Sequence, residues 1–263
     1  NEVVRENEAV TTVRIASPEG RSFRHRAGQF AYFRFLDGVP GGEEHPFTIS
    51  SVPGDSNLAF TAKGIGDFTA ALPQVQPGSP MLVDGPYGVF RCDRVDAGRP
   101  IVMLAGGIGI TPFLSMLGDL ATADTATSGG TRAGDAAGDE SGLKRGTTGN
   151  RPLHLIWTLR TPEELFGLAR LQEYRERLPA LHIQLFFSQL STTAGVPEIE
   201  GVPPEISRAP GRVSIEELAR QGLVGTGREF FLCGPRPMMD TLVRGLRSRG
   251  VPGSHIHFEA FAM

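Results

Sequence analysis

Hydrophobic and polar residues alternate over short runs in residues 1–98, and glycine or proline separates most of these runs. Successive side chains of a strand point to opposite faces, so short alternating or β-branched runs between turn residues predict a small antiparallel β-barrel. One short helix over 67–72, which follows Gly64-Ile65-Gly66, is expected to interrupt it. The predicted strands are residues 10–15, 30–35, 47–51, 58–61 and 81–83.

The pattern changes after Gly98-Arg99-Pro100, where short apolar runs begin to alternate with longer helical stretches. Buried apolar strands that alternate with helices predict a doubly wound parallel sheet. The fold class is therefore all-β plus α/β, with domains over residues 1–98 and 99–263. The strands are expected at 101–105, 153–158, 182–187, 230–233 and 255–258, and the helices at 112–120, 162–177, 214–221 and 235–249.

Two segments do not fit this scheme. Residues 121–150 are rich in Gly, Ala, Thr and Asp and have almost no large apolar side chain, which predicts a flexible insertion. Residues 190–210 contain several prolines, which predict a surface loop.

Composition excludes several classes of function. A formal net charge of −3 without a basic cluster argues against nucleic acid as a partner. The two cysteines, Cys92 and Cys233, cannot build a disulfide framework or a four-cysteine cluster. The histidines form no ligand pattern, so no metal site is expected. No apolar run reaches the roughly 20 residues of a membrane span. Because the chain begins at Asn1, we expect a piece excised from a longer protein whose membrane anchor was removed.

A glycine-rich turn, Ala105-Gly106-Gly107-Ile108-Gly109-Ile110-Thr111-Pro112, follows one predicted strand and opens a helix. Glycines let the backbone approach a pyrophosphate, whose charge then lies against the free N–H groups of the helix. Thr111 is predicted as the N-cap and Pro112 as the first helical residue, although Pro112 replaces the third glycine of the dinucleotide fingerprint. The alternative is a tight turn without a ligand. The predicted nucleotide contacts are Gly106, Gly107, Gly109, Thr111 and Pro112.

Four further segments occur in a fixed order: His45-Pro46-Phe47-Thr48-Ile49-Ser50-Ser51, Gly66-Asp67-Phe68-Thr69, Gly85-Pro86-Tyr87-Gly88 and Cys233-Gly234-Pro235. With the glycine turn between the third and the fourth, nearly the whole chain resembles the ferredoxin–NADP reductase superfamily. It is most similar to the dehydrogenase domains of ferric reductases and NADPH oxidases, because His-Pro-Phe-Thr stands where other members carry Arg-x-Tyr-Ser. The resemblance implies an FAD-dependent oxidoreductase that accepts hydride from NADPH or NADH.

The resemblance assigns the first two segments to FAD. Phe47 would stack on the isoalloxazine, Thr48 would reach the N5 region with its hydroxyl, and His45 would contact the phosphates. The residue types alone leave structural alternatives open, namely a core phenylalanine and an ordinary strand threonine. For Asp67 we favour a helix cap over a ligand. The remaining predicted FAD contacts are Pro46, Ile49, Ser50, Gly66, Phe68 and Thr69.

Gly85-Pro86-Tyr87-Gly88 is expected to be a turn that shapes the seam between the domains, with a purely structural role as the alternative, and the last segment is implied to serve the nicotinamide. Cys233, with Gly234 and Pro235, would bring a thiol beside it and help align the carbon that donates hydride. A buried structural cysteine is the alternative. Near the C-terminus, Phe261 would cover the flavin and be displaced by nicotinamide, with Phe258 in reserve, and Glu259 would relay a proton. Thr48, Cys233, Glu259 and Phe261 are thus the predicted catalytic residues.

The end of the second strand in the nucleotide domain bears on the choice of donor. No acid stands there for the ribose hydroxyls, and Arg160 could pair with a 2′-phosphate. We interpret Glu163 and Glu164 as charges of the first helical turn, with Thr161 and Glu164 forming a capping box. NADPH is favoured and NADH remains the alternative.

The acceptor is implied by the resemblance alone. The favoured hypothesis passes electrons to a haem in a transmembrane domain, possibly of the same polypeptide, and then to O₂ or Fe(III), which would hold the chain in the cytoplasm at the inner face of the cell membrane. One alternative is a free-standing reductase of a ferredoxin, flavodoxin or oxygenase. Another is a redox sensor that binds nucleotide without catalysis.

Overall fold

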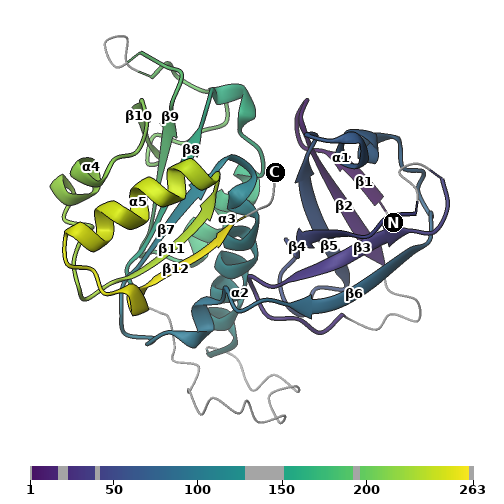
Figure 1. The fold of residues 1–263 in the computed structure, drawn as a ribbon, viewed down its shortest axis with the longest axis horizontal. Coiled ribbons are helices and arrows are strands. Elements are labelled where there is room, and N and C mark those ends of the chain that lie inside the picture. The colour runs from purple at the N-terminus through teal and green to yellow at the C-terminus, as the bar shows by residue number, and fades with distance from the viewer. Residues whose placement is uncertain (1, 17–22, 39–41, 128–150, 192–195, 261–263) are drawn as a thin grey trace.

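The computed structural model describes residues 2–16, 23–38, 42–127, 151–191 and 196–260. Its N-terminal part forms two antiparallel sheets, with strand orders β1-β2-β5 and β4-β3-β6. Figure 1 shows this part on the right, beside the larger C-terminal part. The first sheet contains β1 (Glu2–Arg5), β2 (Val10–Ala16) and β5 (Asn57–Lys63). The second contains β3 (Phe30–Phe35), β4 (His45–Thr48) and β6 (Met81–Tyr87).

The alternation along β3 explains how these sheets make a core. Ala31, Phe33 and Phe35 are buried, whereas Tyr32 between them is exposed. Inward side chains from both sheets share one apolar cluster, which includes Val13 and Phe60. A period of two therefore produces an antiparallel domain with one buried face, as predicted.

The C-terminal part is a parallel sheet of six strands within the described residues, in the order β10-β9-β8-β7-β11-β12. α2 and α3 contribute to the apolar cluster on one face, and α4 and α5 to the cluster on the other. This arrangement confirms the predicted doubly wound sheet. The strands are β7 (Ile101–Gly106), β8 (Leu153–Leu159), β9 (Leu181–Phe187), β10 (Ser207–Pro210), β11 (Glu229–Gly234) and β12 (Ile256–Ala260). The helices are α2 (Thr111–Thr127), α3 (Leu168–Arg177), α4 (Ile215–Arg220) and α5 (Arg236–Ser248), and α1 (Asp67–Ala71) belongs to the first part.

Three predicted segments differ in the structure. The insertion predicted over 121–150 begins later, because α2 continues to Thr127 through an Ala- and Thr-rich stretch that can remain helical. Residues 128–150 lie outside the described residues. The loop predicted over 190–210 contains an edge strand, β10, which pairs with β9; proline is tolerated at its end because it is an edge.

The helix predicted over 162–177 is interrupted. A 3₁₀ turn over Pro162–Glu164 is followed by Gly167, whose φ of 65° is left-handed, and α3 starts only after it. A left-handed residue cannot continue a right-handed helix, so the turn and the helix are separate elements. This break sets the 3₁₀ turn apart from α3, beside the carboxyl end of β8.

The strand order fixes where a ligand can bind. The chain runs outward from β7 to β10 in one direction and then returns to β11 and β12 on the other side of β7. The order therefore reverses between β7 and β11, and ligands of such sheets bind beyond the carboxyl ends of the strands at this point. The glycine-rich turn lies at the carboxyl end of β7, and Cys233-Gly234-Pro235 lies at the carboxyl end of β11.

Candidate cofactor-binding site

The two turns at the switch point are packed backbone against backbone. A Cβ at Gly109 would lie 2.2 Å from the carbonyl oxygen of Cys233. A Cβ at Gly106 would lie 2.6 Å from Cδ of Pro235, and one at Gly234 would lie 2.9 Å from Cα of Gly106. These glycines are therefore required for packing between the turns, whether or not a phosphate binds there.

Gly107 is different, because it combines a φ of 53° with open space around the position of a Cβ. Its carbonyl accepts a hydrogen bond of 2.8 Å from Nε1 of the buried Trp157. Of the three predicted phosphate glycines, Gly107 is thus the one that faces open space. Thr111 has helical dihedral angles (φ −56°, ψ −45°) and follows a 3₁₀ turn, so it is the first residue of α2 rather than the extended N-cap that we predicted. Pro112 is consequently the second helical residue.

A cleft of about 880 Å³ spans the seam between the two parts of the chain. This volume lies in the usual range for cofactor sites. The predicted residues that line it are His45, Pro46, Phe47, Thr48, Gly66, Asp67, Phe68, Thr69, Thr111 and Glu259. Sequence reasoning missed Phe30, Tyr32, Glu43, Thr61, Ala62, Lys63, Ile65 and Ile108, which also line it.

Three cleft residues carry buried polar atoms that have no hydrogen-bond partner among the described residues: Oγ1 of Thr48, Nε2 of His45 and Oε2 of Glu259. Glu43 Oε2 is 3.6 Å from Nε2 of His45. Buried polar groups are normally paired, and such atoms grouped in one cleft are suited to a polar ligand. A flavin and its phosphates offer both donors and acceptors, so these residues fit the predicted FAD.

The Thr48 hydroxyl can be tested against a hydroxyl that is already paired. Oγ1 of Thr61 is 2.8 Å from Oγ1 of Thr12 and 3.0 Å from Oγ of Ser50. We expect Thr48→Val to leave the stability of the FAD-free protein unchanged or slightly higher, and to weaken FAD binding about fivefold, the equivalent of a hydrogen bond of ~1 kcal/mol. Thr61→Val should lower the free energy of unfolding by about 1–3 kcal/mol.

Urea unfolding of the FAD-free variants and FAD titration by flavin fluorescence would measure both effects. Equal FAD affinity of wild-type protein and Thr48→Val would contradict the role of the Thr48 hydroxyl.

Phe47 belongs to an aromatic cluster. Its ring stacks on Phe60 with the centroids 4.8 Å apart, and Phe68 lies 5.8 Å away at an interplanar angle of 22°. The ring of His45 lies 3.9 Å from that of Phe68. Phe47 thus serves the core, as the structural alternative proposed, and lines the cleft as well. Its stacking on the isoalloxazine stays a prediction.

The start of α1 is capped by Thr69 rather than by Asp67. The Thr69 hydroxyl accepts hydrogen bonds from the backbone N–H groups of Ile65 (2.9 Å) and Gly66 (3.1 Å). Gly66 occupies the N-cap position and Asp67 the first helical position, so our prediction of Asp67 as the cap was wrong. The reason is the geometry of the turn, which places the hydroxyl of Thr69, the third residue of the helix, next to the backbone N–H groups of Ile65 and Gly66.

Cys233 and Glu259 sit side by side on β11 and β12, in register. Cys233 is fully buried, and burial together with Glu259 raises the pKa of its thiol well above the usual value. Burial also raises the pKa of the Glu259 carboxyl to about 7. Cys233 does not line the cleft, whereas Glu259 does, so at neutral pH the cleft contains a carboxyl group close to its titration point.

Glu259→Gln would remove this titration. We expect the rate of flavin reduction by NAD(P)H to fall in the wild-type protein as pH rises through about 7, because an ionised carboxylate opposes the negative charge that arrives with a hydride. The variant should show no such inflection. Stopped-flow absorbance with saturating nucleotide measures the rate, and an inflection that persists in the variant would refute this assignment.

The stability of the folded protein should also depend on the ionisation of the Glu259 carboxyl. Between pH 4.5 and about 7 the folded carboxyl keeps its proton, whereas the unfolded one has lost it. The contribution of Glu259 to the free energy of unfolding therefore falls as pH rises through this window. Thermal unfolding of wild-type protein and Glu259→Gln should converge at low pH.

Arg160 is not a free cation, because Glu164 holds it. Nε of Arg160 donates to Oε1 of Glu164 at 2.7 Å, and the backbone N–H of Arg160 donates to Oε2 at 2.8 Å. Oε1 also accepts from Nζ of Lys63 at 2.9 Å, which joins the two domains. Burial opposes ionisation of Glu164, but the hydrogen bonds from Lys63 and Arg160 outweigh it and lower its pKa to about 2.

The capping box predicted for Thr161 and Glu164 is therefore wrong. Thr161 is the N-cap of the 3₁₀ turn without a side-chain cap bond, and the Glu164 carboxylate accepts instead from Lys63 and from the side chain and backbone of Arg160. Further hydrogen bonds across the seam include Nη2 of Arg170 to the carbonyl of Ser50 (2.9 Å), Oγ of Ser115 to that of Ser51 (2.7 Å) and Nδ2 of Asn7 to that of Glu164 (3.2 Å).

Several predicted residues lie away from the cleft. Ile49 and Ser50 are fully buried, so only the first half of their segment faces it. Phe258 is 54% exposed on β12, and Phe261 lies outside the described residues. The residues that were missed come mainly from β3 and β5, whose apolar runs mark them as strand residues but do not say which face borders a ligand.

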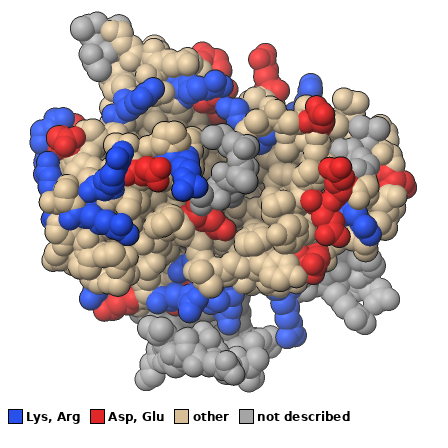
Figure 2. Space-filling view, viewed as in Figure 1, with Lys and Arg blue, Asp and Glu red and all other residues tan. Residues whose placement is uncertain are grey.

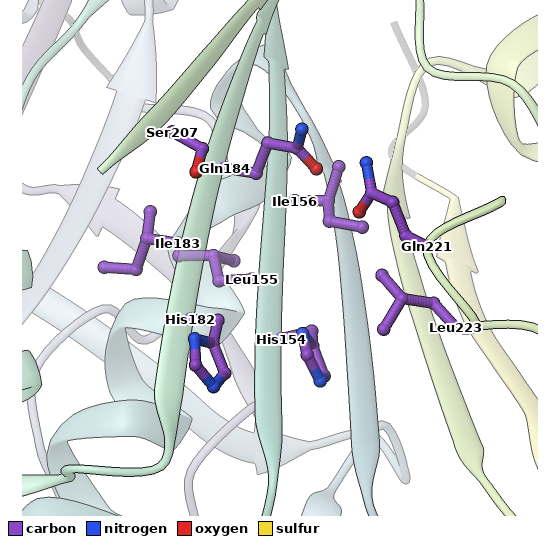
Figure 3. Close-up of a pocket in the computed structure, with 9 residues that line it drawn as sticks. All are labelled: His154, Leu155, Ile156, His182, Ile183, Gln184, Ser207, Gln221 and Leu223. Atoms are coloured by element: carbon purple, nitrogen blue, oxygen red, sulfur yellow. The ribbon is translucent and has the colours of Figure 1, made fainter. Parts of the chain in front are cut away.

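A second hollow, of about 330 Å³, lies toward the amino ends of β8 and β9. Figure 3 shows His154 and His182 next to each other on these neighbouring strands, and their ring centroids are 5.1 Å apart. Burial, with His182 and Arg228 nearby, lowers the pKa of His154 to about 4. None of the predicted site residues lines this hollow, so it is separate from the cofactor cleft.

The described residues lack the side-chain groups for a metal site and the apolar helices for a membrane span. No group of three or more His, Cys, Asp or Glu side chains is arranged there to hold a metal ion. In the same part of the chain no helix combines the length and the apolar character needed to cross a membrane.

Comparison with protein families gives two matches. A family described as an FAD-binding domain matches residues 2–91, and one described as an oxidoreductase NAD-binding domain matches residues 103–244. The first match contains the cleft residues from β3, β4 and α1, and the second contains the glycine-rich turn and Cys233-Gly234-Pro235. FAD and NAD(P) are thus the two cofactors of the chain.

Among curated proteins, a flavohemoprotein of Xylella fastidiosa is 28% identical over 261 residues, covering 97% of this chain and 56% of its own length. The reductase component of propane 2-monooxygenase from Mycolicibacterium smegmatis is 26% identical over 263 residues, covering 96% of this chain and 63% of its own length. The chain therefore spans little more than half of these relatives.

Solved structures with the same fold include a ferredoxin NADP⁺ reductase from Neisseria gonorrhoeae with bound FAD and NADP. Its TM-score is 0.71 at 22% identity, over 98% of this chain and 95% of that one. The FAD/NAD-binding domain of a Vibrio cholerae nitric oxide dioxygenase gives a TM-score of 0.72 at 17% identity, over 99% and 95% of the two chains. With both family matches and this fold, the chain belongs to the ferredoxin–NADP reductase superfamily and is an FAD- and NAD(P)-binding oxidoreductase.

Proposed function

We propose that this protein is a reductase that accepts hydride from NADPH, or less readily from NADH, and delivers electrons one at a time to a separate redox protein. The observation that carries the proposal is the cleft at the seam, where unpaired buried atoms of Thr48 and Glu259 lie between the FAD-binding and the NAD-binding domain. Bound FAD would supply the chemistry by accepting an electron pair and releasing single electrons.

The residues of the chain would hold and orient the reactants. Thr48 and His45 would bond to the flavin and its phosphates, and Gly107 would leave room for the nucleotide pyrophosphate. Glu259 would hold a proton in the cleft up to about pH 7. The packed glycine turns would keep the nucleotide at a fixed distance from the flavin domain, which is what hydride transfer requires.

The identity of the acceptor is also part of the proposal. Relatives named as reductase components of propane 2-monooxygenase and as electron transfer components of toluate 1,2-dioxygenase support delivery to an oxygenase system. A haem in a membrane domain is the second candidate, and it rests on His45-Pro46-Phe47-Thr48, the sequence typical of ferric reductases and NADPH oxidases.

Flavin reduction tests the core of the proposal. Purified protein with excess FAD should be yellow and should bleach when NADPH is added without oxygen. The bleaching rate, titrated with NADPH and then with NADH, gives the donor preference. A protein that binds no FAD, or that fails to bleach with either nucleotide, would falsify the proposed function.

A further inference from the structure

The outer face of the sheet β4-β3-β6 carries large apolar side chains that remain exposed in the described part of the chain. Tyr32 is 36%, Leu82 47% and Tyr87 42% exposed. The rings of Tyr32 and Tyr87 lie 5.9 Å apart, and each lies 5.9 Å from that of Phe30. Exposed clusters of aromatic and aliphatic side chains are typical of protein–protein contact sites.

Carboxylates surround these side chains. The hydroxyl of Tyr87 donates to Asp84 at 3.0 Å, and Asp84 lies opposite Tyr32 in the register of β3 and β6. The hydrogen bond to Asp84 and the charges of Asp84 and Glu44 raise the pKa of Tyr87. Arg34, which is half-buried, is the one Lys or Arg in the three strands. We define Tyr32, Glu44, Leu82, Asp84 and Tyr87 as the acidic–aromatic face.

The net negative charge of the whole chain also lies in the FAD-binding domain. Residues 99–263 contain equal numbers of acidic and basic side chains, so the formal net charge of −3 belongs entirely to residues 1–98. Figure 2 shows acidic side chains gathered on the visible side of the FAD-binding domain, whereas basic ones are more frequent on the other domain. A partner approaching this domain therefore meets a negative surface.

The acidic–aromatic face borders the cofactor cleft. Phe30 and Tyr32, whose rings lie near that of Tyr87, also line the cleft. Glu43, next to Glu44 in the chain, lines it too. A protein seated on this face would therefore lie directly beside a cofactor held in the cleft.

We propose that the electron acceptor is a redox protein with a basic surface around its own cofactor, and that it docks on the acidic–aromatic face. This inference rests on the proposed function and deepens it. Opposite charges speed encounter and select partners, whereas an acidic carrier or an anionic membrane surface would be repelled. One NAD(P)H supplies two electrons, so it reduces two ferric one-electron acceptors and becomes NAD(P)⁺ with release of one proton.

The test uses the FAD-loaded chain, NADPH, and two probes of opposite charge: ferric cytochrome c, which is basic, and an acidic ferredoxin. We expect faster reduction of cytochrome c, at a rate that falls with salt. The double variant Glu44→Lys/Asp84→Lys should slow cytochrome c reduction at low salt at least about tenfold. Flavin bleaching by NADPH should be unchanged, because neither residue lines the cleft.

The control variant Glu2→Lys/Glu8→Lys changes the net charge equally, outside the sheet β4-β3-β6, and should reduce cytochrome c nearly as fast as wild type. Equal rates for the two double variants, or faster reduction of ferredoxin than of cytochrome c, would overturn the docking proposal while bleaching remained intact. Loss of bleaching in the wild-type protein would instead overturn the proposed function.

Discussion

Gly109→Ala is expected to slow NAD(P)H-dependent flavin reduction about 100-fold while FAD still binds, since a displacement of ~1 Å at a hydride-transfer site can cost that much. The added Cβ would lie 2.2 Å from the carbonyl oxygen of Cys233 and 2.9 Å from Cα of Gly234. Both are backbone atoms of the neighbouring turn, so the two turns must move apart. The cost in stability should be about 1–3 kcal/mol.

Gly225→Ala is the matched control, because nothing lies within 4 Å of a Cβ at that position. It should bleach with wild-type kinetics. Stopped-flow reduction of both variants, with FAD content measured by absorbance, separates nucleotide alignment from flavin binding. Wild-type kinetics in Gly109→Ala would mean that the contact between the turns does not position the nucleotide.

Arg160→Ala is expected to raise the KM for NADPH about tenfold and to change the KM for NADH little, since a charge-assisted hydrogen bond to phosphate contributes about 1.5–3 kcal/mol and Glu164 offsets part of it. Glu164→Gln should instead lower the KM for NADPH. It removes the carboxylate that accepts from Nε of Arg160 at 2.7 Å, so the guanidinium is released for the 2′-phosphate.

Arg177→Ala provides the control, because it removes an equivalent exposed ion pair, to Glu173 at 2.9 Å, in α3. Steady-state kinetics with NADPH and with NADH measure the KM of the wild-type protein and of each variant. If Arg160→Ala raises both KM values equally, Arg160 does not read the 2′-phosphate. Since the pKa of Glu164 is about 2, its competition for Arg160 should be independent of pH over the physiological range.

Much of the site followed from local sequence. His45-Pro46-Phe47-Thr48 and Gly66-Asp67-Phe68-Thr69, the two segments that the resemblance assigned to FAD, both line the cleft. Turn chemistry and strand periodicity depend on neighbouring residues, so the sequence displays them directly. The same local reasoning failed for Asp67 and Thr111, because helix capping depends on dihedral angles that the residue types alone do not determine.

The sequence by itself determined the two domains, their order, the two cofactors and the turns that follow β7 and β11. Only the tertiary structure decided that Gly106 and Gly109 serve packing between turns, that Glu164 holds Arg160, and that Thr48 has an unpaired hydroxyl in the cleft. Lys63 and Glu164 are 101 residues apart, and their contact exists only because the domains meet along one seam. Local patterns specify strands and turns, but which distant groups become partners depends on how those elements pack together.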